Sequence, residues 1–301
     1  MTGSLTGHGP PAWFEDAMRC EPEAGRLRVE GAKIEWAAWG ERAKPGLLLL
    51  IGNGAHIGWW RAIAPMLAVD YRVAAFSWSG MGRSDWRDSY PIETLIEEAM
   101  AVSETAGLFD AIQMPFLGAH SFGGFIGLRL MIEHGERFSG GILIDSRLRA
   151  RQTWGAEAQP VPPFHVHETK ELAIARFRLK PEQPEVNRFI LDMLAEESLE
   201  PVGDGWRYRQ DPNMRSKTPL DSDLIPRMAE ARCPLAIVRG VHSRSVIDEI
   251  WREQYAAAPP GTPFVEVPDA HHHLMIDQPL ALVAALRALL QSFPKNGSWN
   301  R

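Results

Sequence analysis

The sequence predicts an α/β protein whose mostly parallel, doubly wound sheet carries a helical insertion. Short apolar runs of strand length alternate with longer stretches of helical periodicity along most of the 301 residues. The alternation stops between about residues 146 and 225, where helical patterns surround a proline-rich loop, and then resumes. We therefore expect a core made of residues 1–145 and 226–301 and a helical cap made of residues 146–225.

The elements follow from these patterns in chain order. The first two strands join at a turn on Gly31 and form an antiparallel edge, and the continuously apolar run 46–51 is typical of a strand buried on both faces. The strands expected in the core are 26–30, 33–39, 46–51, 71–76, 115–119, 140–144, 235–239 and 263–267. The helices expected in the core are 57–68, 92–106, 122–134, 246–257 and 279–293, and helical patterns at 169–179, 184–198 and 224–231 are assigned to the insertion and its end.

Charge and composition exclude several classes of protein. The formal net charge of -6 offers no basic surface for nucleic acid or an anionic membrane. The longest strongly apolar run, residues 47–51, is far shorter than the roughly 20 residues of a membrane span. The N-terminus lacks the basic and apolar regions of a secretory signal. With two cysteines far apart in the sequence, we expect a reduced, cytoplasmic protein.

A candidate nucleophile lies between a predicted strand and a predicted helix, in the segment 118–124 with the sequence GAHSFGG. Such a sharp turn requires small residues two positions before and two after the nucleophile, and Ala119 and Gly123 stand there around Ser121. Gly124 allows the helix to approach the sheet. We expect a strained Ser121 with its hydroxyl at the carboxyl edge of the sheet. The alternative is a glycine-rich turn with an incidental serine.

A serine hydroxyl needs a neighbouring base. The loop after the last predicted strand holds three consecutive histidines, His271, His272 and His273, and it emerges at the same edge of the sheet as Ser121. A metal site is the alternative use of histidines. Adjacent residues do not usually converge on one ion, and no second cluster of ligands is evident in the sequence, so no metal is expected. A purely structural role for all three histidines is the other alternative.

Four segments, LLLLIGNGA, FSWSGMGRSD, GAHSFGG and DAHHHLMIDQP, occur in an order that resembles the α/β-hydrolase superfamily with a helical cap. The resemblance covers the chain from about residue 26 to residue 293. It implies that the catalytic base stands five residues before an acidic residue and seven before a proline. Counting back from Asp277 and Pro279 selects His272.

The same resemblance implies an oxyanion hole made of two backbone amides, those of Asn53 and Phe122. Ile51 stands where the family commonly has a histidine. A dinucleotide-binding loop is the alternative interpretation of the glycines at 52–54. That interpretation is poor, because Ile57 replaces the third glycine and no acidic residue ends the next strand.

The acid of the expected triad is less obvious. The family most often carries an Asp in the loop after the seventh strand of the core, but here the loop 239–245 has no carboxylate and Ser243 stands at that place. Asp145, directly after the strand 140–144, is the candidate acid. Several haloalkane dehalogenases, zearalenone-type lactonases and cofactor-independent hydroxyquinaldine dioxygenases of the superfamily carry their acid there. If Asp145 only caps the strand, a Ser–His dyad remains.

Tryptophan is abundant, with 11 tryptophans against 4 tyrosines. Several of them fall in segments expected to border the site, which favours an apolar or aromatic ligand over a polar one. Packing in the core or cap is the alternative for each. The expected substrate contacts are Trp59, Trp60, Trp78, Met81, Trp154, Phe164 and Trp206, and Trp86 is expected to lie with them around the mouth of the site.

These residues predict a serine hydrolase for a small hydrophobic or aromatic ester or lactone, with Ser121, His272 and Asp145 as its triad. The serine argues against dehalogenase and epoxide-hydrolase chemistry, for which the superfamily uses Asp. Two alternatives stay open: carbon–carbon cleavage or cofactor-independent dioxygenation with His272 and Asp145 as the base, and a ligand receptor on the same fold. We expect a small-molecule partner, no cofactor, no nucleic acid and no membrane, and a homodimer stays open.

Overall fold

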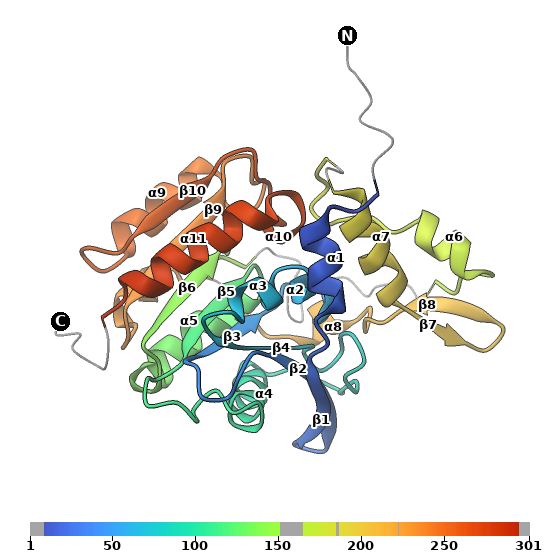
Figure 1. The fold of residues 1–301 in the computed structure, drawn as a ribbon, viewed down its shortest axis with the longest axis horizontal. Helices are drawn as coiled ribbons and strands as arrows, with labels where there is room; N and C mark the ends of the chain where they lie inside the picture. Colours follow the sequence, from blue (N-terminus) through green and yellow to red (C-terminus); the bar gives the residue numbers. More distant parts are fainter. Residues whose placement is uncertain (1–8, 151–164, 185–186, 222, 295–301) are drawn as a thin grey trace, which may run out of the picture.

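The central feature of the computed structural model is an eight-stranded sheet with the order β1-β2-β4-β3-β5-β6-β9-β10 (Figure 1). The structure describes residues 9–150, 165–184, 187–221 and 223–294, so Trp154 and Phe164 lie outside the described residues. The strands of this sheet are β1 (Glu23–Val29), β2 (Ala32–Trp39), β3 (Gly46–Leu50), β4 (Arg72–Phe76), β5 (Phe116–His120), β6 (Gly140–Ile144), β9 (Leu235–Gly240) and β10 (Phe264–Val267).

The sheet is parallel from β4 to β10, and β1 and β2 form the antiparallel edge that the sequence predicts. The mostly parallel α/β fold is therefore confirmed. In the centre, β5 and β6 pair with His120 opposite Ile144. Parallel strands end at the same edge of the sheet. The residues that follow β5 and β6, Ser121 and Asp145, therefore leave the sheet side by side.

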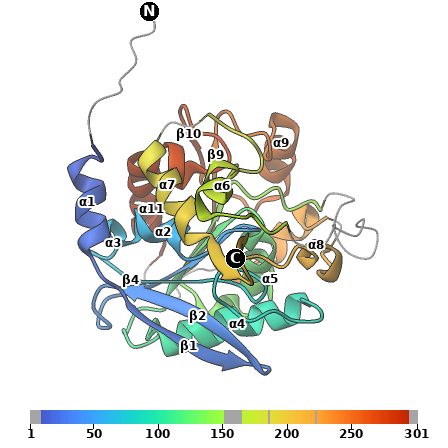
Figure 2. The same ribbon diagram turned by 90° about the vertical axis from the view of Figure 1, so that its right-hand side faces the viewer.

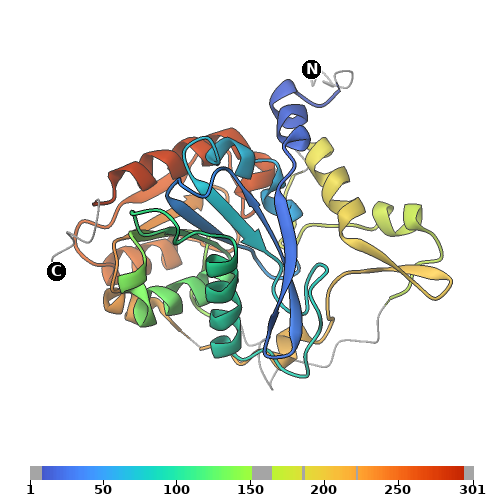
Figure 3. The ribbon, with the colours of Figure 1, turned by 60° about the horizontal axis from the view of Figure 1, so that its bottom comes forward.

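Helices cover both faces of the sheet. Figure 3 shows α3 and α11 on one face and α4, α5 and α9 on the other. The helices of the core are α1 (Ala12–Arg19), α2 (Gly58–Arg61), α3 (Ala64–Leu67), α4 (Ile92–Thr105), α5 (Gly123–Glu133), the 3-10 turn η1 (Gly135–Arg137), α9 (Asp248–Ala257), α10 (Leu274–Asp277) and α11 (Pro279–Ser292). Among the described residues, no helix combines the length and apolar character that crossing a bilayer requires.

The segment between β6 and β9, which we call the cap segment, contains more than the expected helices. Its described elements are α6 (Lys170–Ala175), α7 (Arg188–Glu197), β7 (Leu199–Val202), β8 (Gly205–Tyr208), α8 (Met214–Lys217) and the 3-10 helix η3 (Ile225–Glu230). The antiparallel hairpin β7–β8 is a strand pair that the sequence analysis did not predict. In the view of Figure 2, α6, α7 and the hairpin lie in front of the sheet.

Two further differences concern the chain near the cap segment. The expected helix 57–68 is split into α2 and α3, because Pro65 cannot donate to the helical ladder and its ring crowds the carbonyl four residues earlier. The unpredicted α1 lies against the cap segment, where the ring of Phe189 in α7 meets those of Trp13 and Phe14 at 5.9 and 4.7 Å between centroids. The N-terminal helix thus connects core and cap through aromatic packing.

Candidate active site

Ser121 occupies the sharp turn between β5 and α5 in a left-handed backbone conformation, with φ of 54°. The small residues around it are required by close packing. A Cβ on Gly123 would lie 2.7 Å from the Ile51 carbonyl oxygen, and one on Gly124 would collide with the Ser146 side chain. The turn therefore brings the start of α5 against the ends of β3 and β6.

Three side chains from three different segments form one chain of hydrogen bonds. The Ser121 hydroxyl lies 2.9 Å from Nε2 of His272, and Nδ1 of His272 lies 2.7 Å from Oδ1 of Asp145. An ionised Asp145 can only accept, so His272 donates from Nδ1 and accepts the Ser121 hydroxyl at Nε2. His272 and Asp145 are buried. The arrangement can accept the Ser121 proton and hold the resulting imidazolium beside a carboxylate.

Asp145 is held by donors from the neighbouring strand. Its Oδ2 accepts the Gly240 amide at 2.9 Å, and its Oδ1 accepts the Ser243 hydroxyl at 2.6 Å. Ser243 in turn accepts the amides of Ser245 and Val246. Ser243, which stands where the family most often carries its acid, thus orients the Asp145 carboxylate at the end of β6.

The loop after β3 passes beside the serine. A Cβ on Gly52 would lie 3.2 Å from the Cβ of Ser121, so the backbone leading into Asn53 runs along the nucleophile turn. Phe122 is the residue before α5, directly after Ser121. The indole of Trp78 donates to the Ile51 carbonyl at 3.1 Å and thereby holds the start of the loop. Phe122 is thus next to Ser121 along the chain, and Asn53 follows the glycine that packs against Ser121 across the turn.

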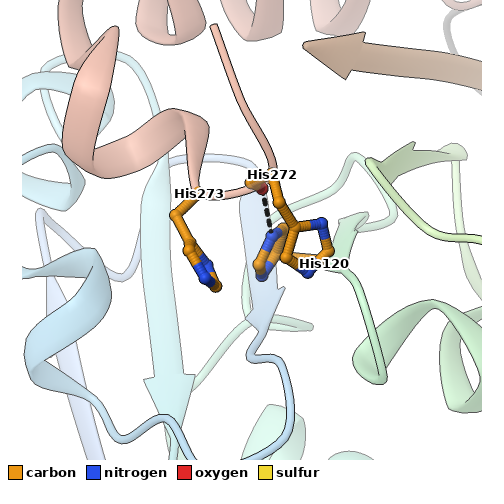
Figure 4. Close-up of side chains that lie close together, drawn as sticks. All are labelled: His120, His272 and His273. Carbon is orange, nitrogen blue, oxygen red and sulfur yellow. Dashed lines mark hydrogen bonds between the residues drawn. The ribbon is translucent and has the colours of Figure 1, made fainter. Parts of the chain in front are cut away.

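The three consecutive histidines have separate environments. His271 turns away to Asp277, whose Oδ2 accepts both its amide at 2.7 Å and its Nδ1 at 3.0 Å. His273 is buried, and its ring lies 4.7 Å from that of His272. His120, which the sequence analysis did not single out, joins these two rings: its Nε2 lies 2.9 Å from the His272 carbonyl oxygen (Figure 4). His120, His272 and His273 form the histidine cluster.

Burial lowers the pKa of two core histidines. Burial and the neighbouring His272 lower the pKa of His120 to about 3, and burial lowers the pKa of His56, after the β3 loop, to about 4. Burial also lowers the pKa of His273, with His272 and His120 contributing. These three rings are therefore neutral at pH 7.

Acidification should destabilise the protein through these rings. Between pH 6.5 and the lower folded-state pKa values of His56 and His120, the unfolded chain binds more protons, so the free energy of unfolding falls as pH falls. Each contributes a loss of about 2 kcal/mol between pH 7 and pH 5. Urea denaturation at both pH values measures this loss of unfolding free energy. In His120→Gln the loss between pH 7 and pH 5 should be smaller by about 2 kcal/mol, because one of the two histidines is gone. An equal loss in wild type and His120→Gln would contradict the assignment.

The expected substrate contacts divide into two groups. Three tryptophans pack edge-on against rings around the site. The ring centroids are 5.0 Å apart for Trp59 and His273, 6.3 Å for Trp60 and His120, and 6.2 Å for Trp78 and Phe122. Trp60 and Trp78 are fully buried, so only part of this aromatic wall can meet a ligand without rearrangement.

The other contacts lie farther along the core–cap boundary. Met81 is buried and bridges to Gln210 of the cap segment. Trp86 stacks with the Arg207 guanidinium at 4.7 Å. Trp206 belongs to β8, in the hairpin that projects away from the sheet (Figure 3), and its backbone pairs with His167. Trp206 thus has contacts within the cap segment, with His167 and with the Lys170 ammonium, and its role as a substrate contact stays a prediction.

A model of the alpha/beta hydrolase family matches residues 47–286, which is most of the chain. The chain belongs to the alpha/beta hydrolase family. The match includes the turn at Ser121, the end of β6 and the loop of His272. It confirms the superfamily that the four sequence segments indicate.

Relatives of this alpha/beta hydrolase carry different activities in their names. The chain is similar to epoxide hydrolase 4 of Mus musculus, with 29% identity over 135 residues, covering 40% of this chain and 36% of the relative. It is also similar to a 2-heptyl-3-hydroxy-4-quinolone dioxygenase of Rhodococcus erythropolis, with 32% identity over 116 residues, covering 36% of this chain and 40% of the relative. The matches thus span well under half of these curated relatives.

Solved structures match the alpha/beta hydrolase over most of its length. E-2-(acetamidomethylene)succinate hydrolase matches with a TM-score of 0.76 and 19% identity, over 90% of this chain and 100% of its own. The enol-lactonase of Burkholderia xenovorans LB400 matches with a TM-score of 0.65 and 19% identity, over 89% of this chain and 100% of its own. At this identity the likeness shows the shared fold.

Proposed function

We propose that this alpha/beta hydrolase is a serine hydrolase that cleaves a small ester or lactone with a hydrophobic or aromatic part. The observation that carries the proposal is the hydrogen-bonded chain from Ser121 through His272 to Asp145, at distances of 2.9 and 2.7 Å. A strained serine at a helix start, an imidazole within bonding distance and a buried carboxylate behind it are the parts that acyl transfer needs.

The reaction proceeds in two halves. Ser121 Oγ attacks the substrate carbonyl carbon while His272 Nε2 takes its proton, and Asp145 stabilises the imidazolium. The amides of Asn53 and Phe122 donate to the oxyanion of the tetrahedral intermediate. Collapse breaks the ester bond, and His272 returns the proton to the leaving alkoxide. Water then loses a proton to His272 and attacks the acyl-enzyme, which releases the acid and restores Ser121.

Two observations support the substrate class. Trp59, edge-on to His273, places aromatic surface beside the site, which suits an apolar or aromatic group. The epoxide hydrolase in the comparisons is a less fitting guide, because Ser121 stands where the superfamily's epoxide hydrolases use Asp. The enol-lactonase has the same fold over its whole length. Esters and lactones are accordingly the first substrates to test.

A fluorophosphonate probe tests the nucleophile directly. We expect stoichiometric labelling of wild type on Ser121, because the probe's phosphorus accepts the same attack as an ester carbonyl. Ser121→Ala should not label. Ser139→Ala is the matched control, since Ser139 precedes β6 at the opposite end of the sheet and should leave labelling intact. A wild type that neither labels on Ser121 nor turns over any ester or lactone would defeat the proposal.

A second candidate is cofactor-independent dioxygenation, favoured by the similarity to the quinolone dioxygenase. In that reaction His272, oriented by Asp145, would remove the proton of a ring hydroxyl, and the electron-rich anion would react with oxygen. Oxygen consumption with 3-hydroxy-4-quinolones tests it. Consumption that survives in Ser121→Ala and is lost in His272→Ala would favour this reaction over ester hydrolysis.

A further inference from the structure

The histidine cluster gathers imidazole nitrogens from two distant segments. One nitrogen from each of His120, His272 and His273 lies within 4.8 Å of one from each of the others, and all three residues are buried (Figure 4). The sequence argument against a metal site rested on the poor convergence of adjacent histidines. The structure supplies a third ring from the nucleophile turn.

Two of the three rings have an outer hydrogen-bond partner of the kind found in metal sites. A ligating histidine commonly donates its other N–H to a carboxylate or a backbone carbonyl, which orients the ring. His272 has the Asp145 carboxylate at 2.7 Å for this purpose, and His120 has the His272 carbonyl at 2.9 Å. Nδ1 of His120 is left on the side of Gly52 and the nucleophile turn.

His273 is the least satisfied member of the cluster. The residue is 4% exposed, and neither ring nitrogen has a hydrogen-bond partner among the described residues. The Lys180 carbonyl lies close to the ring without meeting hydrogen-bond geometry. A buried polar group without a partner is costly, and a ligand that accepts a nitrogen lone pair would satisfy it.

We propose that His120, His272 and His273 form an inhibitory site for Zn²⁺ or a similar divalent transition metal. The inhibitory part rests on the proposed function: an ion on Nε2 of His272 replaces the Ser121 hydroxyl there and removes the general base. Three imidazoles suit Zn²⁺, Co²⁺, Ni²⁺ and Cu²⁺ and do not suit Mg²⁺ or Ca²⁺.

Coordination requires a modest contraction of the cluster. With Zn–N distances of about 2.0–2.1 Å, tetrahedral ligand nitrogens lie about 3.3 Å apart. His273 can supply most of the movement by rotating its side chain, since neither of its ring nitrogens holds a hydrogen bond in the described part of the chain. A tetrahedral ion would take a fourth ligand, such as water, besides the three imidazoles.

Metal binding is measured without reference to activity. Untagged, EDTA-treated and dialysed protein is titrated with Zn²⁺ by calorimetry and with Co²⁺ by visible absorption, and one ion per chain is expected. His120→Gln and His273→Phe should each weaken binding at least tenfold. His167→Phe is the matched control, because His167 is also buried with an unpartnered Nε2 but lies in the cap segment, and it should bind like wild type.

A second arm separates this proposal from the hydrolase. Ser121→Ala should still bind one ion, and Zn²⁺, but not Mg²⁺, should suppress fluorophosphonate labelling of wild type at the concentrations that saturate the site. The metal site would be overturned if wild type showed no one-to-one binding. It would also be overturned if His273→Phe and a second variant, His273→Asn, both bound Zn²⁺ as tightly as wild type. One-to-one binding in a protein that never labels would retain the metal site and reject the hydrolase.

Discussion

His272→Ala is expected to lower kcat for ester hydrolysis by about 10⁶-fold, whereas His271→Ala should stay within about tenfold of wild type. The two histidines are adjacent, yet only His272 reaches the Ser121 hydroxyl, at 2.9 Å. His271 bonds to Asp277 instead, and alanine keeps the backbone half of that contact. Removing the base should cost as much as removing the nucleophile, because the two act as one unit.

Steady-state kinetics on the best ester or lactone of a panel measures this pair of variants. Circular dichroism and thermal unfolding establish that both are folded. Similar losses in His271→Ala and His272→Ala would indicate that the loop as a whole, rather than one imidazole, supports the reaction, and the assignment of the base would then fail.

Asp145→Asn is expected to lower kcat by about 10⁴-fold while leaving the fold intact. Asn is close to Asp in shape, and its oxygen can still accept the Gly240 amide, whereas its NH2 group would donate where Oδ1 of Asp145 accepts the Ser243 hydroxyl. Its amide, however, does not enforce the His272 tautomer that donates from Nδ1, and it does not stabilise the imidazolium. A variant with near-wild-type kcat would show that Ser121 and His272 work as a dyad.

The neighbouring Ser243 allows the acid to be moved. Its Oγ lies 2.6 Å from Oδ1 of Asp145, the oxygen that meets His272. In the Asp145→Asn background, Ser243→Asp should recover at least tenfold of the lost kcat, since a carboxylate is again beside Nδ1. Ser243→Asn in the same background is the matched control and should recover nothing. Equal rates for the two double variants would argue against a charge requirement at this place.

The core of the fold follows from sequence because its signals are strong and local. Strands such as β3 and β6 are continuously apolar runs, and both were predicted within a residue of their observed bounds. The hairpin β7–β8 was not predicted, because its strands are short and partly exposed and one of them contains Pro201. The helix α1 is likewise stabilised by aromatic partners in α7 that only the folded chain supplies.

The site was predictable to the extent that turn chemistry and spacing determine it. Small residues around Ser121 mark the turn, and the resemblance to the family's loop, counted back from Asp277 and Pro279, selects one of three histidines. The structure brings Ser121, His272 and Asp145 into one chain of hydrogen bonds, and their catalytic roles are the proposal made above. His120 was not predicted as part of the site, because its position beside His272 depends on how two segments 152 positions apart in the sequence pack together.

Ser121 and Asp145 both adopt left-handed backbone conformations, with φ of 54° and 45°, directly after paired strands. Such conformations store on the order of 1–3 kcal/mol each, and glycine would relieve that strain. Selection for thermostability alone would therefore favour glycine in place of Ser121, whereas at Asp145 the relief of strain is opposed by the loss of the hydrogen bonds from Gly240, Ser243 and His272. A descendant of this chain that no longer needs the proposed reaction could gain stability by losing this serine, so an unusually stable homologue with glycine at position 121 would be a sign of lost catalysis.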